Sequence, residues 1–417
     1  MRCSPLAAVT VVVLLVNPSA AAAQDAPSSA PAATFTLRTS IKTSGLVFRA
    51  PDAPELFPER TGGESVSRLR LEPEVKVGTD ATFTVAYEQQ LRYSSAPAGI
   101  ATAGILPSES AAPFRIRPLD WTMTQSSGVV WRHEIDRASA RLHRGRADIT
   151  IGRQAIGWGR GVMFGAVDLF APFSPLEADR EWRRGVDAVR ADVKVTDRSS
   201  LDLVGAFGRT VDQSAFGARI RGYAGPIDVE VMGGRRGRDG FGGVTTSAAV
   251  GDAELHAELA AFRVDEPVLG AGARTLLKAV AGGSFRVPVG SGILTYVEYH
   301  YSGFGAARPE DILALLSSPA LAARYARGDT QILSRHAVAV LALYEMSPEI
   351  SFSGQWLQNP KDRSGVVAPG VTYTFGDRTS VLGSVFVPYG RAPRGLTLRS
   401  EYGAASLSAL FQLRLYL

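Results

Sequence analysis

Residues 147–195 read ADITIGRQAIGWGRGVMFGAVDLFAPFSPLEADREWRRGVDAVRADVKV, and the fold prediction starts from this segment. Two alternating runs, 148–151 and 189–195, enclose a segment of roughly thirty residues rich in glycine, aromatic and charged residues, far longer than an ordinary hairpin loop. Loops of such length are disordered or functional, and the tryptophans and phenylalanines argue against disorder. We therefore expect residues 154–184 to fold back into the mouth of a β-barrel.

Most of the remaining sequence alternates apolar with polar residues, for example at 201–207, 227–231, 254–259 and 407–417. This period of two gives a strand one apolar face and one polar face. Alternation alone also fits a soluble sandwich. The connections favour a membrane barrel instead, because very short turns alternate with longer connections along the chain. Outer-membrane barrels have this arrangement, with tight periplasmic turns and long extracellular loops.

We predict an all-β fold, an antiparallel transmembrane β-barrel over residues 34–417 with about 18 strands, or alternatively about 16. Long loops are expected near 94–127, 154–184 and 302–329, and the other longer connections include those near 235–240 and 359–364. Arg308-Pro309-Glu310-Asp311 indicates the start of a helix, with proline at its first position and acids in its first turn. That helix lies either on the surface of its loop or in the lumen.

The N-terminus indicates export. Arg2, an apolar run from Leu6 to Val16 and the small residues Ala20–Ala23 are typical of a cleavable signal peptide over residues 1–23, followed by a flexible tail over 24–33. Cys3 is the only cysteine and leaves with the signal peptide, which excludes disulfides and a cysteine-ligated metal. The 45 basic and 40 acidic residues balance too evenly to indicate a nucleic-acid partner. The predicted location is the bacterial outer membrane.

If apolar residues face lipid, the alternate polar residues face the lumen and determine what passes. The pore-lining candidates are Arg190, Asp192, Lys194, Arg219, Arg221, Asp228, Glu230, Glu254, His256, Glu258, Lys278, Arg286, Glu298 and His300. Basic groups are followed by acidic groups around the wall, which would create a transverse field that orients polar solutes. Alternatively, these groups pair with one another and only line a wet interior.

The long insert supplies its own candidates for a constriction. They are Trp158, Arg160, Asp168, Asp179, Glu181, Arg183 and Arg184. The loop either folds inward or packs outward on the rim. Catalytic patterns are absent from the sequence: the five histidines are scattered, and no nucleophile-elbow, P-loop or dinucleotide motif occurs. We expect no catalytic residues, no metal and no cofactor.

The opening stretch resembles a recurring pattern of bacterial outer-membrane barrels. The matching pieces are IGRQ at 151–154, GWG at 157–159, D-x-F-x-P at 168–172, the acids Asp179 and Glu181, and RGVDA at 184–188. The chain is similar here to porin-like proteins of uncharacterised role and, more distantly, to the alginate-export family of eighteen-stranded monomeric barrels. The alginate-export conduit has a strongly basic lumen. Acids such as Glu254 and Glu258 depart from that pattern, which places polysaccharide export in doubt.

The C-terminal strand also resembles those of outer-membrane barrels, whose assembly machinery reads a terminal aromatic residue. Here the aromatic is Tyr416, one place before the last residue. The expected function is a passive pore for small polar or ionic solutes, with outer-membrane lipid, such solutes and the assembly machinery as partners. Three alternatives stay open: a conduit for a polysaccharide or an apolar nutrient, an outer-membrane hydrolase, and a plugged structural barrel.

Overall fold

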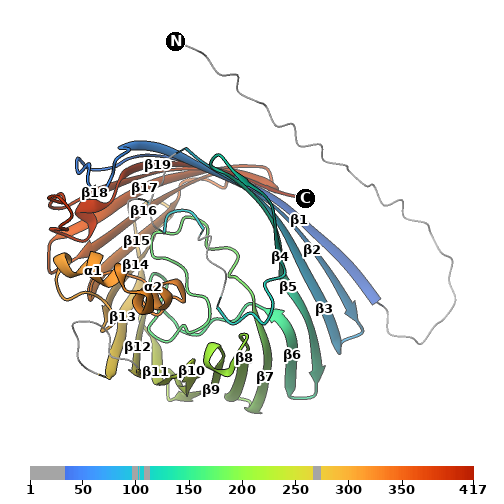
Figure 1. Ribbon diagram of the computed structural model, residues 1–417. Helices are drawn as coiled ribbons and strands as arrows, with labels where there is room; N and C mark the ends of the chain where they lie inside the picture. The colour runs from blue at the N-terminus through green and yellow to red at the C-terminus, as the bar shows by residue number, and fades with distance from the viewer. Residues whose placement is uncertain (1–32, 96–101, 103, 108–112, 266–273) are drawn as a thin grey trace. The chain divides into compact units, whose positions relative to one another are not determined.

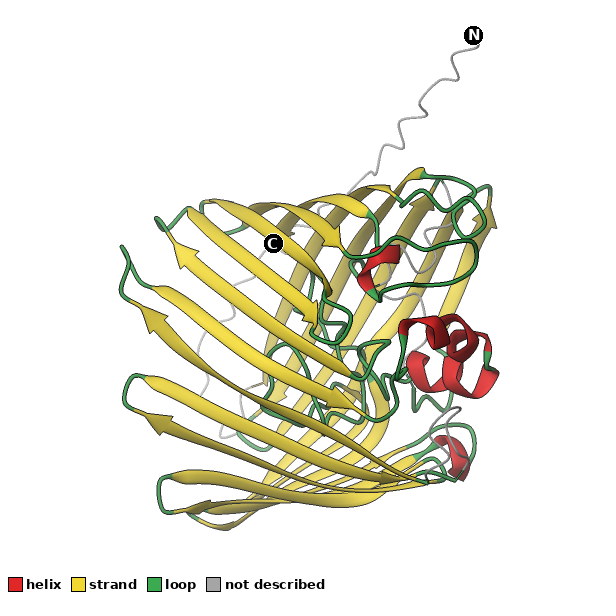
Figure 2. Ribbon diagram, turned by 90° about the vertical axis from the view of Figure 1, so that its left-hand side faces the viewer, coloured by secondary structure: helices red, strands yellow, loops and turns green. Residues whose placement is uncertain are grey.

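The computed structural model describes residues 33–95, 102, 104–107, 113–265 and 274–417, and residues 33–417 form one β-barrel (Figures 1 and 2). The signal peptide predicted over residues 1–23 and the tail from residue 24 lie outside the described residues, except that Ala33 is the first residue of a strand. No helix in the described part of the chain is long and apolar enough to span a membrane.

The barrel is built from antiparallel strands in chain order. Their bounds are Ala33–Arg49 (β1), Thr61–Val77 (β2), Ala81–Ser94 (β3), Asp120–Ser126 (β4), Val129–Arg144 (β5), Ala147–Gln154 (β6), Val186–Thr196 (β7), Ser199–Ala206 (β8), Ala215–Ala224 (β9), Ile227–Arg236 (β10), Asp239–Val250 (β11), Ala253–Arg263 (β12), Thr275–Val287 (β13), Ile293–Ser302 (β14), His336–Glu345 (β15), Ile350–Asn359 (β16), Ser364–Phe375 (β17), Thr379–Tyr389 (β18) and Leu407–Tyr416 (β19). The barrel closes where β1 pairs with β19, from Ser40 opposite Tyr416 to Arg49 opposite Leu407.

Eighteen strand positions make up the wall. The sheet holds 19 strands, but β4 and β6 both pair with the edge of β5 that faces away from β3, so they share one position (19 − 1 = 18). The prediction of an antiparallel barrel of eighteen strands is therefore confirmed. The prediction of one continuous loop over 94–127 is wrong in part, because Asp120–Ser126 forms β4, which continues the position of the short β6 beside β5.

The connections differ between the two ends of the barrel. At one end, the turn end, eight short turns join the strands, such as 197–198 and 225–226. The other end, the loop end, carries the long connections, which include 95–119, 155–185 and 303–335. The predicted connection over 235–240 is shorter than expected. Arg236 and Asp239 are paired, which leaves a two-residue turn with Gly237 in a left-handed conformation.

The outward face of the wall is apolar because the strands alternate. On β9, Ile220 is 60% exposed while its neighbour Arg219 is 6% exposed. On β19, Phe411 is 55% exposed while Gln412 is 1% exposed. A strand in water would bury the apolar side chain instead of the polar one, so this inverted pattern fits a wall surrounded by hydrocarbon.

Two short helices lie at the loop end, within the 303–335 connection (Figures 1 and 2). A 3₁₀ turn over Pro309–Asp311 leads into α1 (Ile312–Ser317), and α2 (Pro319–Ala326) follows. The predicted helix start at Pro309 is thus confirmed. Arg324 of α2 pairs with Asp239, the first residue of β11, at 2.5 Å, which holds the helices at the mouth of the barrel.

Candidate functional site

Residues 155–185, the inward loop, fold into the barrel and cross its interior (Figure 1). The loop leaves β6 after Gln154 and returns at Val186, and these two residues are paired. At the junction Arg153 is 1% exposed, and its Nε donates to the Asp187 carboxylate at 2.7 Å. The loop therefore starts and ends at one closed point of the wall. The prediction that it folds inward is confirmed.

Two carboxylates of the wall bind the backbone of the inward loop. Glu258 on β12 and Glu298 on β14 are 2% and 0% exposed. Glu258 accepts hydrogen bonds from the backbone N–H groups of Arg160, Gly161, Ala166 and Val167. Glu298 accepts from those of Val162, Met163 and Phe164. Buried carboxylates satisfied by several N–H donors are strong, charge-assisted anchors, so these two fix the first half of the loop to the wall.

Glycines allow the loop backbone to approach these carboxylates. Gly159 has a φ of 109°, and a Cβ there would lie 2.8 Å from Glu258 Oε1. A Cβ on Gly161 would lie 2.0 Å from the carbonyl oxygen of Phe164. Both positions exclude any side chain, the first by conformation as well as by space. The Gly-Trp-Gly-Arg-Gly sequence thus follows from the need to wrap backbone N–H groups around a carboxylate.

Side chains of the same segment bind neighbouring strands. Arg160 lies 2.6 Å from Asp228 and 3.1 Å from Glu230, both on β10. The indole of Trp158 donates to Asp202 on β8 at 3.1 Å. The Arg219 guanidinium lies over the Trp158 ring, 5.3 Å from its centroid. Together with the bonds to Glu258 and Glu298, these contacts attach the inward loop to the part of the wall between β8 and β14.

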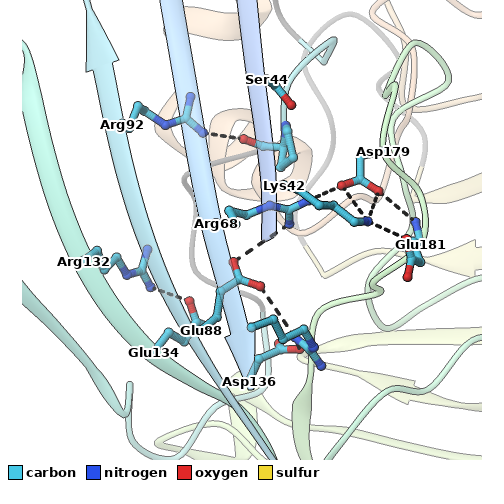
Figure 3. Close-up of polar contacts among 12 residues, drawn as sticks. Lys42, Ser44, Arg68, Glu88, Arg92, Arg132, Glu134, Asp136, Asp179 and Glu181 are labelled. Atoms are coloured by element: carbon cyan, nitrogen blue, oxygen red, sulfur yellow. Dashed lines mark hydrogen bonds and ion pairs between the residues drawn. The ribbon is translucent and has the colours of Figure 1, made fainter. Parts of the chain in front are cut away.

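The second half of the loop binds the opposite side of the barrel, at β1 and β2 (Figure 3). Asp179 is 3% exposed and accepts from Lys42 Nζ at 2.9 Å and from the Arg68 guanidinium. Glu181 accepts from the same Lys42 at 2.6 Å. The Lys42 ammonium also lies 3.7 Å from the centroid of the Trp182 ring. The loop therefore spans the lumen and is attached at both walls.

A charge network on β2, β3 and β5 continues from this attachment (Figure 3). Arg70 pairs with Asp136 at 3.0 Å and lies 3.6 Å from Glu88. Asp136 also accepts the backbone N–H of Gly185, the last residue of the inward loop, at 2.8 Å. Sequence reasoning missed this network and Lys42. The signal was present in Arg68-Leu69-Arg70-Leu71-Glu72, where charged and apolar residues alternate.

Two polar cavities border the inward loop. The larger, about 400 Å³, lies mainly within the curve of the loop and is lined by residues that include Arg180, Arg183 and Asp168. The smaller, about 70 Å³, lies between the loop and β2, β3 and β5, where Glu88, Arg132 and Trp182 line it. Both spaces are lined by charged side chains. The loop thus leaves polar space on either side of its path across the barrel.

Many predicted pore-lining residues are ion-paired. Arg190 binds Asp202 at 2.9 Å, Asp192 binds Arg221 at 2.8 Å, and Arg219 binds Glu230 at 3.1 Å. His256 lies between Glu254 and Glu298, at 3.1 and 3.2 Å. Because these charges are paired at contact distance, they largely neutralise one another. The transverse field across the lumen stays a prediction.

Other predicted residues have different surroundings. Lys278 is buried, and the His300 ring stacks on Phe164 with centroids 4.9 Å apart. Lys194 and Arg286 lie exposed towards the turn end of β7 and β13, away from the inward loop. In the loop itself, Arg183 pairs with Asp168, and Arg184 lines the smaller cavity.

The loop end contains a buried carboxyl group, Glu401, in the 390–406 connection. Glu401 accepts from the backbone N–H groups of Leu333 and Ser334, at 2.9 and 3.1 Å, and from the Asn359 side chain at 3.0 Å. Burial raises the pKa of Glu401 to about 7, although these donors lower it. One carboxyl group thus connects two loops and the end of β16.

The raised pKa of Glu401 predicts a pH-dependent stability. Between about pH 4.5 and about pH 7 the folded protein keeps a proton that the unfolded chain releases, so stability falls as the pH rises through this window. We expect the urea unfolding free energy to be higher at pH 5 than at pH 8 by on the order of 2 kcal/mol from this group. The Glu401→Gln variant should lose that part of the difference. An identical pH profile in the variant would contradict the assignment.

Within the described residues, no group of three or more histidine, cysteine or acidic side chains is placed to hold a metal ion. The histidine contacts there involve tyrosine, acids or aromatic rings, as in His133 with Tyr87, His143 with Asp148 and His336 with Tyr299. None of the hydrogen bonds among those residues joins a histidine to a serine hydroxyl, which a serine hydrolase requires.

Comparisons with known proteins place the fold. No model of a protein family matches the sequence, and no curated protein matches it. Solved porin structures are similar in fold. The BenF-like porin of Pseudomonas fluorescens Pf-5 superposes with a TM-score of 0.53 at 9% identity, over 92% of this chain and 98% of that one.

Two further solved structures agree. Pseudomonas aeruginosa OccK5 (OpdH) has a TM-score of 0.53 at 9% identity, over 91% of this chain and 98% of that one. Acinetobacter baumannii OccAB4 has a TM-score of 0.51 at 7% identity, over 92% of this chain and 98% of that one. At such low identity the likeness establishes a shared fold and nothing about the individual contacts described above.

Proposed function

We propose that the chain is a passive pore of the bacterial outer membrane that conducts small polar or ionic solutes and is narrowed by the inward loop. The observation that carries the proposal is a closed barrel with an apolar exterior, crossed by a loop that is attached to two opposite walls and bordered by polar cavities. Such an interior offers hydrated, charged surfaces to a solute. The fold shared with solved porins supports the same function.

The same proposal includes the route to the membrane. Residues 1–23 direct export as a cleavable signal peptide, and the last strand, with Tyr416, is read by the barrel-assembly machinery. The turn end then faces the periplasm and the loop end faces outward. The fold likeness supports the porin part of the resemblance found in the sequence. The link to alginate export stays a prediction.

The alternative functions have less support. A polysaccharide conduit would need a continuous charged track, whereas the lumen charges pair with one another and with the loop. A hydrolase would need a nucleophile and a base in contact, and the described histidines have other partners. A plugged structural barrel differs from a pore only in conductance. Single-channel recording in planar bilayers, with salts and uncharged sugars, therefore tests the proposal directly, and a folded barrel without conductance would refute it.

Deleting residues 158–181 should widen the pore. The segments that flank the deletion leave the wall at one point, because Gln154 and Val186 are paired, so a short linker can join them. We expect a severalfold larger single-channel conductance, because the loop no longer crosses the lumen. A deletion variant that inserts and conducts like the unmodified protein would show that the loop does not limit ion flow.

A further inference from the structure

A third cavity, of about 80 Å³, lies at the loop end of the barrel. Its wall is formed by Leu357, Val366 and Phe386, which lie near the loop end of β16, β17 and β18. The connections close it, with Ile332 from the 303–335 connection and Leu398 from the 390–406 connection. Each of these five side chains is less than 5% exposed. The cavity is therefore an apolar pocket, which the inward loop also borders through Ser174, Pro175 and Leu176.

The only charged residue lining this pocket, among the described residues, is Glu401. Its oxygens already accept from Leu333, Ser334 and Asn359. No lysine or arginine lines the pocket in the described part of the chain, so an anion would be buried beside a carboxyl group without a counter-charge. Burial of an unpaired charge is costly, and the pocket therefore excludes carboxylates and other anions.

Hydroxyl groups at the edge of the pocket lack partners. Ser406 is 2% exposed, and its Oγ is buried with no hydrogen bond in the described structure. Tyr325 and Tyr402 also line the pocket, and none of the described hydrogen bonds involves their phenol oxygens. Of the three, the Ser406 hydroxyl is buried without a partner, which costs roughly 1–3 kcal/mol. A molecule that offered a polar group here would recover part of that cost.

We propose that this pocket binds a small uncharged molecule with a compact apolar body and a single hydroxyl or carbonyl group. The apolar body lies among Leu357, Val366, Phe386 and Leu398, and the polar group bonds with the hydroxyls of Ser406, Tyr325 and Tyr402. The volume of about 80 Å³ limits the body to a few carbon atoms, since the engineered cavity that accommodates benzene is nearly twice as large, at ~150 Å³. The proposal concerns binding in this pocket and does not depend on conduction.

The test uses the full barrel in lipid nanodiscs and follows fluorine NMR signals of 2-fluoroethanol, fluoroethane and fluoroacetate. The unmodified protein should broaden the 2-fluoroethanol signal in a saturable way, fluoroethane more weakly, and fluoroacetate not at all. Ala404 lines the pocket and is 3% exposed, so Ala404→Leu should fill it and weaken 2-fluoroethanol binding about tenfold or more, equivalent to at least ~1.4 kcal/mol. Ala257→Leu, on the exposed face of β12, is the matched control and should bind normally.

A second variant keeps the volume and removes the hydroxyls. Tyr402→Phe combined with Ser406→Ala should abolish the preference for 2-fluoroethanol over fluoroethane while fluoroethane still binds. β-Sheet circular dichroism confirms folding of each variant. The proposal is overturned if the unmodified protein gives no saturable broadening, because water alone would then fill the pocket. It is also overturned if Ala404→Leu binds like Ala257→Leu, or if fluoroacetate binds as tightly as 2-fluoroethanol.

Discussion

Replacing Glu258 and Glu298 together by glutamine should release the first half of the inward loop and raise both the conductance and the current noise of the pore. Each carboxylate offers two oxygens: Glu258 accepts from four backbone N–H groups of the loop and Glu298 from three. A glutamine keeps one oxygen and turns an NH₂ group towards the remaining donors. Each buried donor left unpaired costs roughly 1–3 kcal/mol, and each ~1.4 kcal/mol raises the released fraction tenfold.

Glu254→Gln is the matched control for this experiment. Glu254 lies on the same strand as Glu258, but its side chain is 43% exposed and contacts His256 rather than the inward loop. Its conductance should equal that of the unmodified protein. A folded Glu258→Gln, Glu298→Gln double variant whose conductance and noise match those of Glu254→Gln would show that the carboxylates do not hold the loop.

Much of the barrel follows from local patterns that the sequence displays. Alternation such as Leu407 to Tyr416 predicts a strand, and the segregation of short turns from long connections predicts a membrane barrel rather than a sandwich. The length and composition of residues 155–185 predict an inward loop. Each of these inferences needs only neighbours in sequence, which is why each survives comparison with the structure.

The roles of the lumen charges could not be predicted in the same way. Alternation places Glu258 and Glu298 on the inner face, but it does not distinguish a carboxylate in water from one that binds loop N–H groups about a hundred residues away. Strand β4 was missed because residues Asp120–Ser126 become a strand by pairing with the first half of β5. The short β6 pairs with the second half of β5 and leaves that edge open. Lys42 was missed because its partner, Asp179, lies 137 positions along the chain.

Asp179 should be the most sensitive single position for stability. It is 3% exposed, and Asp179→Asn would leave Lys42, 1% exposed, and Arg68 with less than their full counter-charge in a buried site. Removing one partner of a buried ion pair costs roughly 3–5 kcal/mol. We expect a loss of this size in urea unfolding, together with increased current noise as the second half of the loop loosens from β1 and β2.

Glu181→Gln is the matched control, since Glu181 binds the same Lys42 ammonium but its side chain is 40% exposed. Solvent screens an exposed pair, so this variant should lose less than about 1 kcal/mol. Burial raises the pKa of Asp179, but the charges of Arg68 and Lys42 outweigh burial and hold it below the usual range. A lowered pKa means that the folded protein sheds this proton more readily than the unfolded chain, so the contribution is complete at neutral pH. It is lost only as the pH falls through the ordinary carboxyl pKa towards the lowered one. If Asp179→Asn were no less stable than Glu181→Gln at pH 7, the attachment to β1 and β2 would be too weak to hold the loop across the lumen.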